Sequence, residues 1–329
     1  MAHWWLPSLA LAFGCLTVDA AQADTPLPPT EGPGSPGTAA AEVRQVDGPK
    51  GGDGYVLFLP EAPRPETAPV VVFLHGWGAI RPRAYLGWID HLVRRGNIVI
   101  YPYYQDGLAT PSADFLGHAA KGIAAALAAL PAAGIAPDLD RVAVVGHSAG
   151  GMVAAGLGAQ AAAFGLPRFS AVMAVQPGNS AKRGSVSIPL ADVSTMPAET
   201  LLLSVFAADD AMVGDHDARR IYDETVHVPA QNKNLLALVS DHHGRPALVA
   251  NHFAATAARD RGFLEAGEMG IGRIDALDWY GTWKLFDALT DTAFHDGLNR
   301  DVALGGGPKQ TYMGRWSDGT PVQPIRVVK

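Results

Sequence analysis

Residues 141–151 read RVAVVGHSAGG and place one serine, Ser148, in a sharp turn between an apolar run and a run of small residues. G-x-S-x-G between a strand and a helix is typical of a nucleophile elbow, which holds the serine hydroxyl clear of the sheet to attack a carbonyl. Gly146 and Gly150 fit this interpretation, because side chains there would collide with the neighbouring strand and helix. The N-terminus of the following helix favours developing negative charge. A structural serine in a Gly-rich turn is the alternative.

Two nucleotide-binding interpretations of the same glycines fail. A dinucleotide fingerprint needs G-x-G-x-x-G, and Ser148 stands where its second glycine would be. A phosphate loop needs Gly-Lys followed by Ser or Thr, which is absent from this turn.

The elements that must position this serine are short apolar runs separated by helical patterns. The runs do not alternate polar with apolar residues, so we expect strands of a parallel sheet that are buried on both faces. They span residues 70–74, 98–101, 142–145, 171–175, 201–206 and 235–239, and residues 50–60 read as an earlier strand, one arm of a hairpin. Helices are expected at residues 85–95, 113–130, 149–164, about 217–222 and 274–289. This alternation predicts an α/β fold in a single domain of residues 42–329, which ends in an irregular, Gly-rich extension.

With Ser148 in this setting, the chain resembles the α/β-hydrolases of the serine esterase and lipase type over about residues 50–290. The resemblance implies a mainly parallel central sheet flanked by helices. It also implies a catalytic triad in the chain order serine, acid, histidine.

The oxyanion hole follows from the same resemblance. Residues 70–78 read VVVFLHGWG, and the family pattern implies that the backbone N–H groups of Trp77 and Ala149 bind the oxyanion. His75 is expected to be structural. The ring of Trp77, together with Tyr103 and Met152, is expected to line the substrate pocket.

The acid and the histidine of the triad are expected in the loops that follow two later strands. Asp210 begins an Asp-x-x-Val pattern after residues 201–206, and Asp209 is the rival acid. Two adjacent histidines follow residues 235–239, at the strand end where open α/β sheets place their sites. We expect His243 to exchange a proton with the serine while the acid orients it. His242 and His252 are the alternatives, with loop packing as the expected role of His252.

The amino-acid composition limits which classes of binding partner are expected. The chain of 329 residues has 25 Lys and Arg against 32 Asp and Glu, a net charge of −7, so nucleic acid is not an expected partner. A hydrophobic fraction of 48% with 17% charged residues excludes a disordered chain. No cofactor or metal is implied, since the acidic cluster at residues 215–217 reads as a helix start.

The N-terminus predicts export. Residues 1–23 read as a signal peptide with an apolar run at 4–18 and Ala-Gln-Ala before Asp24; an uncleaved membrane anchor is the alternative. Cys15 lies inside this segment, lipidation of it is not expected, and cleavage would leave no cysteine. Residues 24–41 are rich in Pro, Gly, Thr and Ala and read as a flexible linker. We expect a periplasmic or secreted protein without stable membrane insertion after cleavage.

The function predicted from these residues is hydrolysis of a small-molecule or lipid-like carboxylic ester through an acyl-enzyme. An exported peptidase or amidase, an acyltransferase, and a non-catalytic binding protein on the same scaffold are the alternatives. Residues 245–272 are expected to cover the site.

Overall fold

The computed structural model describes residue 1 and residues 23–181, 187–259 and 271–329. Residues 2–22 of the expected signal peptide and residues 260–270 of the expected site cover lie outside the described residues. Within the described ranges, no helix combines the length and the apolar character that a membrane span requires.

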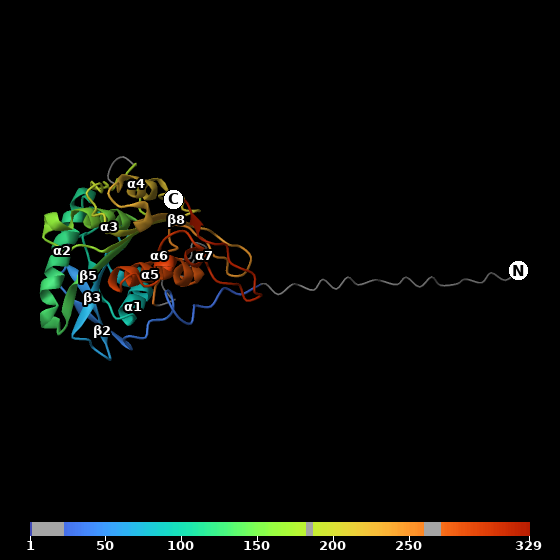
Figure 1. Cartoon of the computed structure of the whole chain (residues 1–329), viewed down its shortest axis with the longest axis horizontal. Coiled ribbons are helices and arrows are strands. Elements are labelled where there is room, and N and C mark those ends of the chain that lie inside the picture. The colour runs from blue at the N-terminus through green and yellow to red at the C-terminus, as the bar shows by residue number, and fades with distance from the viewer. Residues whose placement is uncertain (2–22, 182–186, 260–270) are drawn as a thin grey trace.

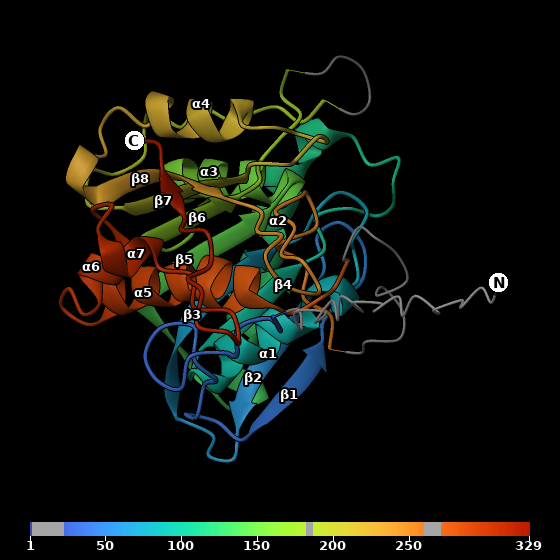
Figure 2. The same cartoon turned by 90° about the vertical axis from the view of Figure 1, so that its right-hand side faces the viewer.

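One sheet of nine strands runs through the described part of the chain, in the order β1-β2-β4-β3-β5-β6-β7-β8-β9 (Figures 1 and 2). The six strands from β4 to β8 pair in parallel, while β1, β2 and β9 pair antiparallel at the two edges. The strands are β1 Glu42–Asp47, β2 Tyr55–Glu61, β3 Thr67–Leu74, β4 Ile98–Pro102, β5 Ala136–His147, β6 Ala171–Val175, β7 Leu201–Ala207, β8 Lys233–Leu238 and β9 Arg326–Val327. The expected α/β fold with a mainly parallel sheet is therefore confirmed.

Helices cover both faces of this sheet (Figure 2). The first layer, α2, α3 and α4, packs with one apolar core, and the second, α1 and α5, packs with another. The helices are α1 Leu86–Arg94, α2 Phe115–Ala129, α3 Ala149–Gln160, α4 His216–Glu224, α5 Trp283–Phe294, α6 Arg300–Ala303 and α7 Pro308–Thr311. A π-helical stretch, Leu277–Thr282, leads directly into α5. The two helix layers lie on opposite faces of the sheet, so each layer borders a different side of the site.

Residues 24–41, whose composition predicts a flexible linker, contact the body of the domain. They lie along the second layer, where the Gly34 N–H donates to the buried Asp287 carboxylate at 2.7 Å and the Ala39 N–H donates to the Arg94 carbonyl at 2.8 Å. Gly34 has a φ of +85°, and a Cβ on it would lie 1.9 Å from the Trp279 carbonyl oxygen. Glycine is therefore needed at position 34 for this close approach.

The C-terminal extension is part of the body as well. It supplies β9 and the buried Trp316, which belongs to the core, as does Trp283 in α5. Lys284 is almost fully buried, and its ammonium group donates to the carbonyl of Gln310 at 2.8 Å and to that of Tyr312 at 2.5 Å. Burial lowers the pKa of Lys284 to about 7.

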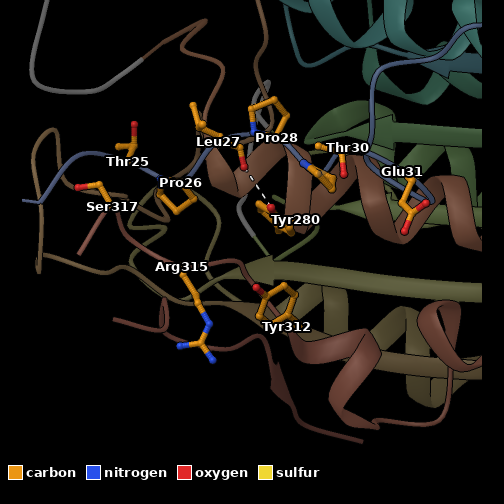
Figure 3. A pocket seen from close by; sticks show the side chains of 11 residues that line it. Thr25, Pro26, Leu27, Pro28, Thr30, Glu31, Tyr280, Tyr312, Arg315 and Ser317 are labelled. Atoms are coloured by element: carbon orange, nitrogen blue, oxygen red, sulfur yellow. Dashed lines mark hydrogen bonds between the residues drawn. The ribbon is translucent and has the colours of Figure 1, made fainter. Parts of the chain in front are cut away.

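Residues 25–31 lie beside Tyr280 and part of the C-terminal extension, and together they line an open hollow of about 620 Å3 (Figure 3). The Tyr280 hydroxyl donates to the Leu27 carbonyl at 3.1 Å, and the Asp24 N–H donates to the Ser317 hydroxyl at 2.8 Å. Hydrogen bonds therefore join segments that lie almost 300 residues apart in the sequence.

Candidate active site

Ser148 lies in the turn between β5 and α3, in a backbone conformation that explains the glycines around it. Its φ of 57° and ψ of −119° are rare for a residue with a side chain and cost on the order of 1–3 kcal/mol. A Cβ on Gly146 would lie 2.0 Å from the Gly150 carbonyl oxygen, and one on Gly150 would lie 2.2 Å from the Leu74 carbonyl oxygen. Helix and strand approach the turn so closely that only glycine fits at both positions.

Three side chains meet at the carboxyl edge of the sheet. His252 Nε2 lies 3.0 Å from Ser148 Oγ, and His252 Nδ1 lies 2.7 Å from Asp210 Oδ2. All three residues are at most 7% exposed. Because the ionised carboxylate only accepts hydrogen bonds, His252 carries its proton on Nδ1 and presents a bare Nε2 to the serine hydroxyl. This tautomer is the one that accepts the serine proton.

His243 was expected in that position, and the structure corrects this expectation. His243 points away from the serine and pairs with Asp318 of the C-terminal extension, Nε2 to Oδ2, at 2.7 Å. Its side chain is 41% exposed, and His242 beside it is also exposed. His252, which was expected to serve loop packing, lies against Ser148 instead.

The loop after β8 shows why the nearer histidines do not reach the serine. Asp241 and Leu248 exchange backbone hydrogen bonds of 2.8 and 2.9 Å, so residues 242–247 project outward as an excursion. The chain then returns to the sheet, where the Asp209 N–H donates to the Ala250 carbonyl at 3.0 Å. Only after this return does the loop run beside Asp210, and His252 is the first histidine there.

Asp210 rather than Asp209 faces the site. Its Oδ1 accepts the backbone N–H groups of Met212 and Val213 at 2.9 and 3.1 Å. Burial opposes ionisation of Asp210, but His252 and the two N–H groups outweigh it and hold its pKa below the ordinary value. Asp209 is exposed and accepts the Ser240 hydroxyl at 2.5 Å.

Gln176 joins the acid to the histidine loop, and the sequence patterns did not single it out. Its Nε2 donates to Asp210 Oδ2 at 3.2 Å and to the Asn251 carbonyl at 2.6 Å. The residue follows β6 directly, is fully buried and has a φ of 46°. Its signal in the sequence is a polar residue placed directly after the apolar run at residues 171–175.

We expect Gln176→Ala to lower kcat by about 10- to 100-fold with little change in KM, since hydrogen bonds to charged groups contribute about 1.5–3 kcal/mol. Gln176→Glu should also raise the pKa of Asp210, because it places a second carboxylate there, and so weaken activity most at acidic pH. Steady-state kinetics from pH 5 to 8 measure both effects. Gln160→Ala, at a half-buried glutamine at the end of α3 whose Nε2 donates to the Asp192 carbonyl at 3.3 Å, is the control. Unchanged kcat in both Gln176 variants would contradict this role.

A second hydrogen-bond network runs beneath the serine. His147 Nε2 lies 2.8 Å from the His252 carbonyl, so it carries the proton, and its Nδ1 accepts the Tyr85 hydroxyl at 2.8 Å. The Tyr85 oxygen in turn accepts the Gly76 N–H at 2.9 Å. Burial lowers the pKa of His147 to about 3, which keeps the ring neutral. The backbone of the histidine loop is thereby linked to the turn after β3.

That turn is the expected oxyanion loop, and it lies against the serine. A Cβ on Gly76 would lie 3.4 Å from Ser148 Cβ, and the Gly78 N–H donates to Gln105 Oε1 at 2.9 Å, which fixes the turn. Among the described residues, the backbone N–H groups of Trp77 and Ala149 have no acceptor. Both expected donors therefore stay available for a substrate oxygen.

Of the other predicted residues around the site, some have a structural role and some line a cavity. His75 is fully buried, stacks on Tyr104 at 4.1 Å between ring centroids, and lies 2.7 Å from the Tyr103 carbonyl through Nε2. Burial lowers the pKa of His75 to about 4, as expected for a structural residue. Tyr103 is 9% exposed and lies against Gly54, whereas Met152 lines a cavity.

In the described ranges, no three His, Cys, Asp or Glu side chains are grouped so that they could hold a metal ion. The acidic residues near α4 have protein partners: Asp215 pairs with Arg219 at 2.7 Å, and the buried Asp217 accepts the Ser180 N–H at 2.9 Å.

The parallel sheet, the flanking helices and the strand–Ser148–helix turn define a protein of the α/β-hydrolase superfamily. The family model described as Chlorophyllase matches residues 42–207, just over half of the chain. The chain therefore belongs to the chlorophyllase family, which supports a serine ester hydrolase-type function in general terms. No curated protein matches it. The family match includes Trp77 and Ser148 and ends before Asp210 and His252.

Proposed function

We propose that this protein hydrolyses carboxylic esters by a Ser148–His252–Asp210 triad through an acyl-enzyme intermediate. The observation that carries the proposal is the continuous contact from Ser148 Oγ to His252 at 3.0 Å and from His252 to Asp210 at 2.7 Å. Nucleophile, base and orienting acid within hydrogen-bond reach are the arrangement that activates a serine.

In the proposed reaction, Ser148 Oγ attacks the ester carbonyl carbon while its proton passes to His252 Nε2. Asp210 stabilises the imidazolium that forms and remains a carboxylate. The N–H groups of Trp77 and Ala149 bind the oxyanion, and one such donor is worth about 2.7–4 kcal/mol. His252 then gives the proton to the leaving alkoxide. Water attacks the acyl-enzyme by the same route and releases the acid.

The test is initial-rate hydrolysis of p-nitrophenyl acetate, butyrate, hexanoate, octanoate and palmitate by the wild type and Ser148→Ala. Chlorophyll is added as a substrate because the family carries its name. We expect the variant to lose at least about 10³-fold in kcat, since the nucleophile is gone. Circular dichroism checks that the variant is folded. Activity that persists in Ser148→Ala, or activity on amides but not esters, would refute the proposal.

We also propose that the protein is exported and that a peptidase cleaves it after Ala23. The apolar run at residues 4–18 and the Ala-Gln-Ala pattern support this proposal. Expression of the full chain with N-terminal sequencing of the periplasmic and medium fractions should give a chain that begins at Asp24. Recovery of the uncut chain from the cytoplasm alone would contradict it.

A further inference from the structure

A cavity of about 180 Å3 lies between α2, α3 and the loop after β6. Its walls are mostly apolar and include Phe115, Leu116, Met152, Ile188 and Ala191. The hydroxyl of Ser112, also in the lining, donates to the Ser187 carbonyl at 2.5 Å and so is already satisfied. A cavity lined in this way suits a hydrocarbon group better than a polar one.

Two residues that line the cavity, Met152 and Phe115, contact the segments that carry the expected oxyanion donors. Met152 lies one helical turn beyond Ser148, and its N–H donates to the Ser148 carbonyl at 3.4 Å. On the other side, the ring of Phe115 contacts the ring of Trp77 edge to face, with centroids 5.3 Å apart. The cavity therefore lies next to the two segments between which the ester carbonyl must be held, with Met152 and Phe115 as the connecting side chains.

The position of His252 tells which part of an ester would enter the cavity. The histidine loop packs with the second helix layer through Leu248, Ala250 and Ala255, whereas Met152 packs with the first layer. The leaving alkoxide must face His252, because the histidine protonates it. The group on the opposite side of the carbonyl, toward the first layer, is the acyl chain.

We propose that this cavity receives the acyl chain of the ester and that the enzyme prefers short acyl chains of about four to six carbons. A volume of about 180 Å3 equals roughly six waters at about 30 Å3 each, and a methylene group is of similar size. It is also smaller than the 300–1,000 Å3 or so of most ligand pockets. The inference rests on the proposed ester hydrolysis.

The p-nitrophenyl ester series measures this preference directly. We expect kcat/KM to rise from acetate to butyrate or hexanoate by up to about fourfold per methylene, and to fall at least tenfold by octanoate and palmitate. A preference for octanoate, palmitate or chlorophyll over butyrate would overturn the proposal.

Two variants change the cavity from opposite walls. Ala191→Phe should fill it and lower kcat/KM for butyrate and hexanoate at least tenfold, while the value for acetate stays within about threefold. Met152→Ala should enlarge it and raise the octanoate-to-butyrate ratio, although loss of this buried side chain also lowers the stability of the fold. Ala162→Phe, at an exposed position after α3, is the matched control and should leave the profile unchanged.

The two ways of failing are distinguishable. If no ester is cleaved in a Ser148-dependent manner, the proposed function falls and the acyl pocket falls with it. If esters are cleaved but folded Ala191→Phe keeps the wild-type chain-length profile, only the acyl pocket is refuted.

Discussion

Replacing His252 by Ala should reduce kcat by about 10³-fold or more. Without its imidazole, nothing accepts the Ser148 proton or protonates the leaving group, and removing one triad member costs several orders of magnitude in serine hydrolases. Steady-state hydrolysis of p-nitrophenyl butyrate at pH 7.5 measures the loss. Active-site titration with a fluorophosphonate should fail in the same variant, because the serine is no longer activated.

His243→Ala is the matched control, and it separates the structure from the sequence-based expectation. His243 forms an exposed pair with Asp318, and such pairs contribute about 0–1 kcal/mol. Its kcat should stay within about threefold of the wild type. Severe loss in His243→Ala with normal activity in His252→Ala would contradict the triad proposed here.

Asp210→Asn should lower kcat by up to about 10⁴-fold, the size of effect seen when the triad acid of a serine protease is neutralised. The amide cannot hold His252 in the tautomer with Nδ1 protonated, so Nε2 no longer faces Ser148 as a base. Substrate binding does not use this carboxylate, and KM should change little. Measurement of kcat and KM from pH 6 to 9 tests both parts.

Asp209→Asn is the control for the acid. Asp209 is exposed and contacts Ser240, so its loss should change kcat by less than about threefold. Because the pKa of Asp210 lies below its ordinary value of about 3.9, the carboxylate stays ionised throughout the pH range of the assay. A loss in Asp210→Asn that disappears at higher pH would therefore point to a different role.

The sheet could be read from the sequence because its strands are buried on both faces. An apolar run such as residues 70–74 has no other stable place in a folded chain, and it forms the end of β3. The turn that carries Ser148 could also be predicted, since steric contacts at Gly146 and Gly150 leave glycine as the only choice. Local physical constraints of this kind determine these elements.

The histidine could not be placed in the same way, because its position depends on tertiary contacts. His243 and His252 follow the same strand, and only the pairing of Asp241 with Leu248 decides which one returns to the sheet. The contacts of residues 24–41 could not be predicted for a related reason: a segment without hydrophobic periodicity can still dock through backbone hydrogen bonds such as that of Gly34. Gln176 lies in no motif and gains its role from two partners distant in sequence.

The hydrogen bonds between the C-terminal extension and the histidine loop have a consequence for biosynthesis. Asp241, at the base of the loop excursion, accepts the Trp316 indole N–H at 3.1 Å and the Gln323 N–H at 2.8 Å. Synthesis and the proposed export both deliver the chain from its N-terminus, so residues 42–252, and with them the whole triad, arrive before these two partners. The partly delivered chain therefore has its serine, acid and histidine without the contacts that brace the histidine loop. Full activity should arise only when residues 316–323 have also been delivered.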